Sequence, residues 1–269
     1  MLECAAIRMP KSSPTTVAPM IIREIRAALD ARADEKCRLA AISAQPKSPV
    51  KTLGVRSSNL KSIAKETLAK LRLAPDYAAT IALMDTAVTR KIREEILISL
   101  ELLDRFRREF DISLFPKLEK WAAVTEDLEL AEAFGSRLAA PLLAMDPSRM
   151  TVVRKWAKLK SVGKRRFAVL AAMGLVTEGR REATAVLDLC EFLLNEDNPI
   201  LVAEIGTLLR ETTRVDAKAV QDFLFRRSVD ANPDILRAGS QNLDAARRAA
   251  LIAKLEAQSG VSALVAAER

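Results

Sequence analysis

A recurring spacing of about 36 residues constrains what this chain can fold into. The tripeptide Lys-Trp-Ala occurs at 120–122 and again at 155–157, 35 residues later. Helix-breaking residues mark the junctions between the repeated segments, namely Asp111, Pro147, Gly163 and the run 195–199, which ends in Asn-Pro. An internal period of this length indicates a stack of similar structural units rather than a single irregular core.

The segments between these breakers have helical periodicity. Ile92, Ile96, Leu100 and Leu103 recur at steps of four, four and three, which places them on one face of a helix. Ala, Leu, Arg, Glu and Lys dominate the composition, whereas aromatic residues are only 4% and glycines only 8 of 269. Strong helix formers with few turn and strand residues predict an all-α chain.

The period accommodates two helices per unit. We expect first helices of successive pairs to begin near Ile112, Ser148, Glu182 and Asp216, and second helices near Lys91, Asp127, Gly163 and Pro199. The predicted fold class is therefore an all-α, α-α superhelix of the ARM/HEAT-like repeat type, with the second helices lining the concave face. We expect a flexible leader at 1–16, a single HEAT-like-repeat solenoid domain at 17–256 and a C-terminal tail at 257–269.

Charge is unevenly distributed along the chain. The 43 Lys and Arg residues exceed the 35 Asp and Glu residues, which gives a formal net charge of +8. Residues 154–166 contain seven basic residues and no acid, whereas 182–197 contain five acidic residues and no base. Such a balance favours a polyanionic partner, although a solvated charged loop has the same composition.

Four residues of the basic stretch flank or open the second helix expected near Gly163. Basic side chains at a helix start, beside its free backbone N–H groups, are suited to contacting phosphates. We therefore predict that Lys160, Lys164, Arg165 and Arg166 contact a phosphate backbone, which the family resemblance described below implies is that of double-stranded DNA.

The chain contains no histidine. This excludes Ser-His-Asp and Cys-His catalysis, histidine metal ligands and imidazole proton transfer. Cys4, Cys37 and Cys190 lack the spacing of a zinc site or a disulfide framework, so we expect them to be small apolar side chains in a reducing compartment. We expect no metal, no cofactor and no membrane partner, and a monomer in the cytoplasm, because no long apolar run or signal peptide is apparent.

Trp121 and Trp156 occupy equivalent positions of the repeat. Repetition at the end of a first helix favours packing between the paired helices over stacking on a nucleic-acid base. We expect both rings to belong to the core.

Three segments together resemble one family. They are KTLGVRSSNLKSIAKE (51–66), WAKLKSVGKRRFAVLAAM (156–173) and NPILVAEIGTLLRE (198–211). Over roughly residues 20–253 the chain resembles the HEAT-like-repeat alkylpurine DNA glycosylases, the DNA alkylation repair (AlkD-like) family. The resemblance implies a superhelix that holds duplex DNA on its basic concave face and excises N3- or N7-alkylated purines. Such purines are cationic, so they leave without a general acid, and a carboxylate stabilises the oxocarbenium-like sugar.

The resemblance also assigns individual positions. The catalytic carboxylate of the family corresponds to Glu132 in LELAEAF (128–134), and its phosphate-binding arginine corresponds to Arg166. Its two catalytic tryptophans correspond to Leu128 and Thr207, and a nearby lysine corresponds to Ala203. Three functions follow as alternatives: a DNA glycosylase that uses Glu132, a non-catalytic binder of duplex or distorted DNA, and a protein-binding solenoid scaffold. In the last two, Glu132 is an ordinary residue of a polar helix face.

Overall fold

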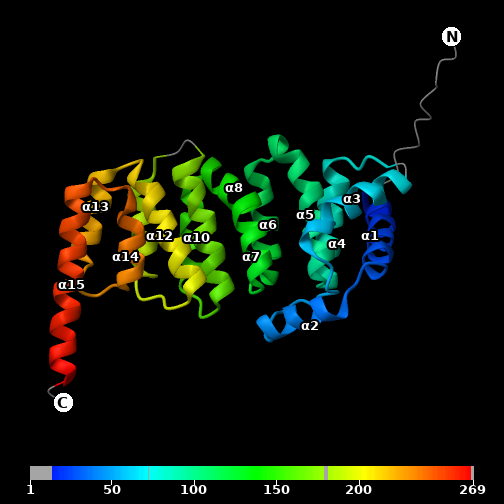
Figure 1. Cartoon of the computed structure of the whole chain (residues 1–269). Helices are drawn as coiled ribbons and strands as arrows, with labels where there is room; N and C mark the ends of the chain where they lie inside the picture. The colour runs from blue at the N-terminus through cyan, green and yellow to red at the C-terminus, as the bar shows by residue number, and fades with distance from the viewer. Residues whose placement is uncertain (1–13, 72, 179–180, 268–269) are drawn as a thin grey trace, which may run out of the picture. The chain divides into compact units, whose positions relative to one another are not determined.

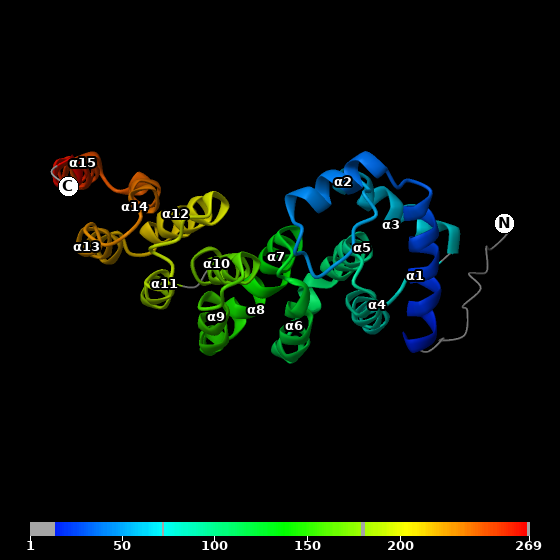
Figure 2. The same ribbon diagram turned by 90° about the horizontal axis from the view of Figure 1, so that it is seen from below.

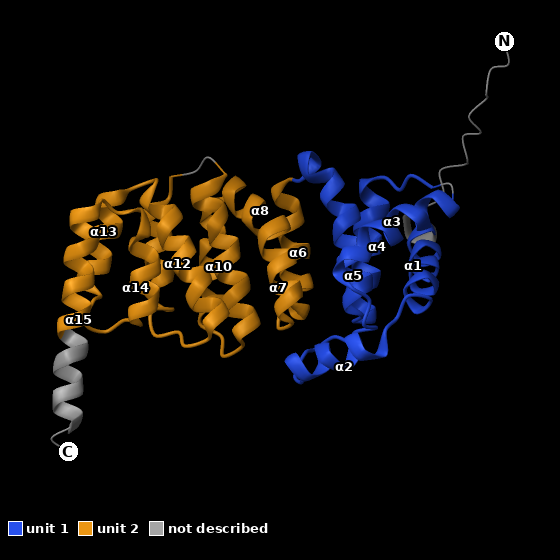
Figure 3. Ribbon diagram, viewed as in Figure 1, with its two compact units in different colours: residues 1–110 blue, residues 111–269 orange. Residues whose placement is uncertain are grey.

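The computed structural model describes residues 14–71, 73–178 and 181–267. Within them the chain is helical, and the backbone of Lys51 and Ile92 forms an isolated bridge rather than a strand. The all-α prediction is therefore confirmed, and the elements are labelled in Figure 1. The chain divides into two compact units, residues 1–110 and 111–269 (Figure 3). The expected limits of a single solenoid domain stay a prediction.

Helices extend into both the expected leader and the expected tail. Residues 1–13 of the expected leader lie outside the described residues, and the first helix begins at Pro14. The last helix continues through the expected tail as far as Ala267.

The described part of unit 1 contains four packed α-helices and one additional short α-helix. The packed helices are α1 (Pro14–Asp30), α3 (Ser57–Leu71), α4 (Tyr77–Arg90) and α5 (Arg93–Leu103), and the short helix is α2 (Glu35–Ala44). Helix α1 packs on α3 and α4, and α5 packs on the same two helices. The core between them is apolar and includes Ile21, Ile25, Leu83 and Ile96, each fully buried. Burial of these apolar stripes is the main stabilising contribution in this unit.

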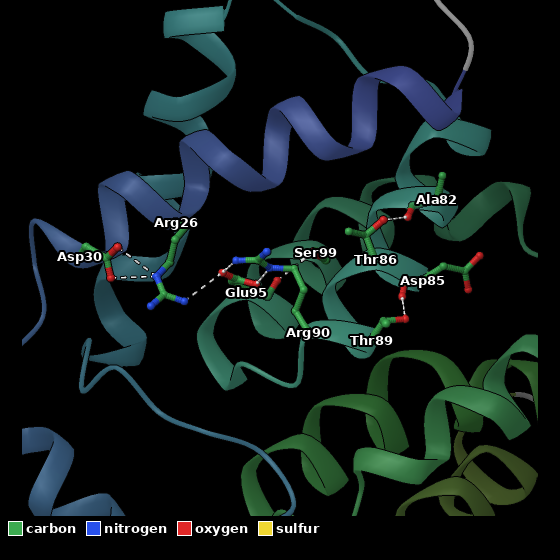
Figure 4. A network of polar contacts seen from close by, with 9 residues as sticks. All are labelled: Arg26, Asp30, Ala82, Asp85, Thr86, Thr89, Arg90, Glu95 and Ser99. Carbon is green, nitrogen blue, oxygen red and sulfur yellow. Dashed lines mark hydrogen bonds and ion pairs between the residues drawn. The ribbon is translucent and has the colours of Figure 1, made fainter.

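A buried carboxylate connects three helices of unit 1 (Figure 4). The side chain of Glu95, at the start of α5, is completely buried. Arg90 at the end of α4 donates to both of its oxygens, at 2.7 and 3.1 Å. Arg26 of α1 lies 3.6 Å from the same carboxylate and also donates to Asp30 at 2.8 Å. The two guanidinium groups compensate the charge that α5 carries into the core.

Unit 2 consists of helix pairs. Its helices are α6 (Phe115–Trp121), α7 (Leu128–Phe134), α8 (Ala140–Met145), α9 (Met150–Ala157), α10 (Val162–Thr177), α11 (Ala183–Cys190), α12 (Pro199–Thr213), α13 (Ala217–Arg226), α14 (Pro233–Gly239) and α15 (Ala245–Ala267). Helices α6, α9, α11 and α13 form one row, and α7, α10, α12 and α14 form a second row beside it (Figure 2). The first row and α7, α10 and α12 of the second row are expected helices, α14 is an additional one, and the helix expected near Lys91 is α5 of unit 1.

The predicted helix starts are confirmed to within a few residues because local caps determine them. Asp127 is the N-cap of α7 and accepts hydrogen bonds from the N–H groups of Glu129 and Leu130, both at 3.1 Å. Asn198 caps α12, with Pro199 in its first turn. A short polar side chain is favourable at a helix start because it accepts a hydrogen bond from an otherwise unpaired N–H group. Proline is favourable in the first turn because it has no N–H group that would remain unpaired.

The second helix of the first pair in unit 2 is interrupted. Helices α7 and α8 are continuous through a π-helical turn at 135–139. Pro141, in the first turn of α8, has no N–H to donate to the helix, and the wider turn accommodates this loss. The wider turn begins only after Phe134, so α7 itself stays a regular helix.

The two tryptophans differ in burial and in surroundings. Trp121 is 2% exposed. The ring of Trp156 lies 4.6 Å from that of Phe167 on α10 and 6.4 Å from that of Phe115 on α6, measured between centroids. The predicted core role is confirmed for Trp121, and half-buried Trp156 joins an aromatic cluster that connects neighbouring repeats.

Candidate functional site

The start of α10 is positioned by a close approach to the segment that precedes α7. Ser161 caps α10, with its side chain accepting from the N–H of Lys164 at 3.4 Å. A Cβ atom on Gly163 would overlap the backbone carbonyl groups of Thr125 and Glu126. Only glycine therefore allows α10 to begin here, and this approach brings the next turn of α10 beside α7.

Arg166 connects three second helices. Its Nη2 lies 2.7 Å from Glu132 Oε2 on α7, and its Nη1 donates to the carbonyl oxygen of Leu128 at 2.5 Å. Its Nε donates to Glu204 Oε1 on α12 at 2.8 Å. The predicted catalytic and phosphate-binding residues are thus brought together, and sequence reasoning missed the third member, Glu204. We call Glu132, Arg166 and Glu204 the charged cluster.

Burial divides the charged cluster into an inner and an outer part. The side chain of Arg166 is 10% exposed and that of Glu204 is 18% exposed, whereas that of Glu132 is 61% exposed. Arg166 is therefore an internal counter-ion, and Glu132 is the member that solvent or a ligand reaches.

The pKa values of the inner members follow from their surroundings. Burial raises the pKa of Glu204, and the neighbouring Glu132 charge raises it further, against the opposing effect of Arg166. Burial acts to lower the pKa of Arg166, but its hydrogen bonds and ion pairs with Glu204 and Glu132 outweigh burial, so the pKa rises. Glu204 Oε2 is buried and has no hydrogen-bond partner among the described residues. With all three groups ionised the cluster carries a net negative charge, which favours a cationic ligand.

The other predicted phosphate-binding residues lie in different environments. Lys164 is 9% exposed, and its ammonium group contacts the carbonyl oxygen of Ala122. Burial lowers the pKa of Lys164. Arg165 donates to Glu196 Oε2 at 2.6 Å and to the carbonyl oxygen of Lys160 at 2.7 Å. Lys160 itself is exposed. Of the four predicted residues, Lys160 presents its side chain to solvent.

Arginines of the basic stretch pair with carboxylates from the following repeat. Arg154 donates to Asp188 at 2.8 Å, and Arg165 pairs with Glu196. Both acids come from the acidic stretch 182–197, which is separated in the sequence from the basic stretch 154–166. The separations of 34 and 31 residues are close to one repeat. The period therefore indicates that these two stretches lie near each other, but it does not identify which side chains pair.

Three lysines of the basic stretch stay exposed around α9 and the turn that follows it, namely Lys155, Lys158 and Lys160. The ammonium group of Lys158 lies 4.1 Å from the ring centroid of Phe192, which is 45% exposed. A cation above an aromatic ring is stabilised and still open to an anion. These lysines are the side chains of the basic stretch that solvent reaches most freely.

The two positions that correspond to tryptophans in the resemblance carry no aromatic ring. Leu128 and Thr207 are both half-buried, and the hydroxyl of Thr207 donates to the carbonyl oxygen of Ala203 at 2.9 Å. Trp121 and Trp156 are engaged in the packing described above, so they do not replace the missing rings.

Two of the three cysteines, Cys37 and Cys190, lie within the described residues, and Cys4 lies outside them. Burial raises the pKa of the Cys190 thiol to about 12, as expected of a packed apolar side chain. Cys37 is half-buried. Among the described residues, no group of cysteine, aspartate or glutamate side chains is arranged to hold a metal ion. The described helices include none that is long and apolar enough to cross a membrane.

Paired helices with a charged cluster across three second helices define an all-α helical-repeat protein. A family model for DNA alkylation repair enzyme matches residues 25–243. The chain therefore belongs to the DNA alkylation repair enzyme family, and its function is related to DNA alkylation repair.

A solved structure supports the fold. The chain is similar to a predicted DNA alkylation repair enzyme from Enterococcus faecalis, with a TM-score of 0.58 and 11% sequence identity over 80% of this chain and 98% of that one. At this identity the likeness shows the fold alone. No curated protein matches the chain.

Proposed function

We propose that this protein is a DNA glycosylase that excises cationic N3- or N7-alkylated purines from duplex DNA, with Glu132 as its catalytic residue. One observation carries the proposal. Glu132 is an exposed carboxylate, and a buried arginine 2.7 Å away fixes its orientation. Membership of the DNA alkylation repair enzyme family supports alkylated DNA as the substrate.

The chemistry needs only what the charged cluster contains. An alkylated purine already carries a positive charge, so cleavage of its glycosidic bond requires no proton donor and thus no histidine. The developing charge on the sugar is stabilised by a negative group held in place before the reaction. Glu132 provides that charge and can accept a proton from the attacking water.

Arg166 has a positioning role in this proposal. Its donors are directed to Glu132, Leu128 and Glu204, so a phosphate would have to compete with two carboxylates for it. We therefore propose that the exposed lysines Lys155, Lys158 and Lys160 contact phosphate. Arg165 makes a smaller contribution, because it is paired with Glu196 and its side chain is only 19% exposed.

A second candidate function is a non-catalytic binder of duplex or distorted DNA. It is favoured by Leu128 and Thr207, which provide no π face beside the sugar. A cation–π contact is worth about 0.5–2 kcal/mol. The absence of two such contacts would lower the rate by roughly one to three orders of magnitude, because about 1.36 kcal/mol corresponds to a factor of ten.

The decisive experiment measures the release of 7-methylguanine and 3-methyladenine from methylated duplex DNA. We expect release by the wild type and its loss in Glu132→Gln, which keeps the shape and removes the charge. Glu119→Gln is the matched control, because Glu119 is an exposed glutamate on the first helix α6.

DNA binding is measured separately by fluorescence anisotropy at several salt concentrations. Binding that weakens with salt, without base release at high protein concentration, would favour the non-catalytic function. Equal release by wild type and Glu132→Gln would remove Glu132 from the reaction. Lys160→Gln should lower the slope of log K against log salt by about 0.9, the value for one phosphate contact.

A further inference from the structure

Helix α2 is the least embedded helix of unit 1. None of its residues from Glu35 to Ala44 is buried. Two large apolar side chains one turn apart, Leu39 and Ile42, are 54% and 42% exposed. In Figures 1 and 3 the helix runs crosswise to α1, α4 and α5. Burial of its own side chains therefore does not account for its position.

The position of α2 is determined through the segment that follows it. Glu94, 2% exposed at the start of α5, accepts hydrogen bonds from the hydroxyl of Thr52 at 2.6 Å and from the N–H groups of Leu53 and Gly54 at 2.9 and 3.0 Å. Gly54 has a φ of 79°, and a Cβ atom there would overlap the carbonyl oxygen of Asp34, the N-cap of α2. The core thus holds the first turn of α2 in place and leaves its remaining surface open.

The charge around α2 is strongly positive. Residues 31–56 contain six basic and two acidic residues, a net charge of +4. Of the basic side chains, Arg38 is paired with Glu35 at 2.6 Å. Lys36 and Lys47 are exposed and form no ion pair within the described part of the chain. Two unpaired cations therefore flank an exposed apolar pair.

We propose that α2 and the segment up to residue 56 form a binding surface for duplex DNA, with Leu39 and Ile42 against a groove and Lys36 and Lys47 on phosphates. The proposal rests on the DNA-binding part of the proposed function. Apolar side chains that enter a groove next to basic ones are a general means of binding deformed duplexes. The charge favours this occupant over a second copy of the chain, whose surface is itself basic.

The test compares the full-length chain with Leu39→Ser/Ile42→Ser in fluorescence anisotropy against a labelled duplex. We expect binding to weaken about tenfold with an unchanged salt slope, because apolar contacts release no counterions. Lys36→Gln/Lys47→Gln should instead reduce the slope by about 1.8, the value for two phosphates. Val229→Ser is the matched control, since Val229 is a 76% exposed apolar residue of unit 2.

Several outcomes would overturn the proposal. Leu39→Ser/Ile42→Ser with wild-type affinity would do so, and so would a wild type that binds no duplex. A variant that changes only the oligomeric state, or only binding to anionic vesicles, would assign the surface to a second copy or a lipid surface. Failure of the glycosylase assay with intact DNA binding leaves this proposal standing, so the two proposals fail separately. Unchanged melting temperatures of the variants show that they are folded.

Discussion

Replacing Arg166 by methionine should destabilise unit 2 through the charge that it leaves behind. Methionine keeps most of the length and apolar volume of the side chain and removes every donor. The substitution therefore abolishes the hydrogen bonds to Glu204, Glu132 and the carbonyl oxygen of Leu128. The Glu132 side chain is 61% exposed, so water replaces its partner at little cost. The Glu204 side chain is only 18% exposed, so water solvates its charge much less.

The expected magnitude follows from the inner pair. Removing one partner of a mostly buried ion pair costs about 3–5 kcal/mol, chiefly because the other charge stays buried without compensation. We expect a loss near the lower end, about 3 kcal/mol, because Glu204 retains some exposure. For a unit of this size that loss corresponds to a fall in the melting temperature of roughly 6–12 °C.

A second substitution separates this cause from a loss of packing. In Arg166→Met/Glu204→Gln the stranded charge is absent, so the double variant should recover about 2 kcal/mol relative to Arg166→Met. Chemical denaturation of the wild type, Arg166→Met, Glu204→Gln and the double variant, monitored by circular dichroism, gives the coupling energy. A double variant no more stable than Arg166→Met would refute the reasoning and indicate that Arg166 stabilises the unit by packing alone.

The pH dependence provides an independent check of the same account. The pKa of Glu204 is raised in the folded state above its ordinary value of 4.5, so the folded state holds this proton more tightly than the unfolded state. The associated stability is present below pH 4.5 and is lost as the pH rises through the raised value. Glu204→Gln should therefore gain stability relative to wild type as the pH rises from 4 toward 7. A constant difference across this range would contradict the assignment.

Three further predictions concern single positions. Gly163→Ala should destabilise the protein by about 1–3 kcal/mol in chemical denaturation, because its methyl group would overlap the carbonyl oxygen of Thr125. An unchanged denaturation midpoint would refute this close approach. Glu94→Ala should cost about 2–4 kcal/mol, since several donors lose their buried acceptor, and raised proteolysis before α3 would reveal the loosened segment. Iodoacetamide at pH 8 should modify Cys37 before Cys190, whose thiol is buried with a pKa of about 12. Peptide mass spectrometry would show the order, and equal rates would contradict it.

Local features of the sequence determine the helix pairs of unit 2. The spacing of apolar residues and breakers predicts where each helix begins, because capping depends on residues within one turn. Asp127 and Pro199 act in this way, and α7 and α12 begin at these positions. Trp121 and Trp156 recur with the period, and their packing role follows from that recurrence.

Contacts between repeats are decided only by the tertiary structure. The stretch 154–166, with seven basic residues and no acid, appears in sequence as an open polycation, yet Arg165 pairs with Glu196 from the next repeat and Lys164 is buried. Arg166 likewise meets Glu132, 34 residues before it, and Glu204, 38 residues after it. Stacking places residues about one repeat apart in contact, so the charge that a ligand meets depends on partners from neighbouring units.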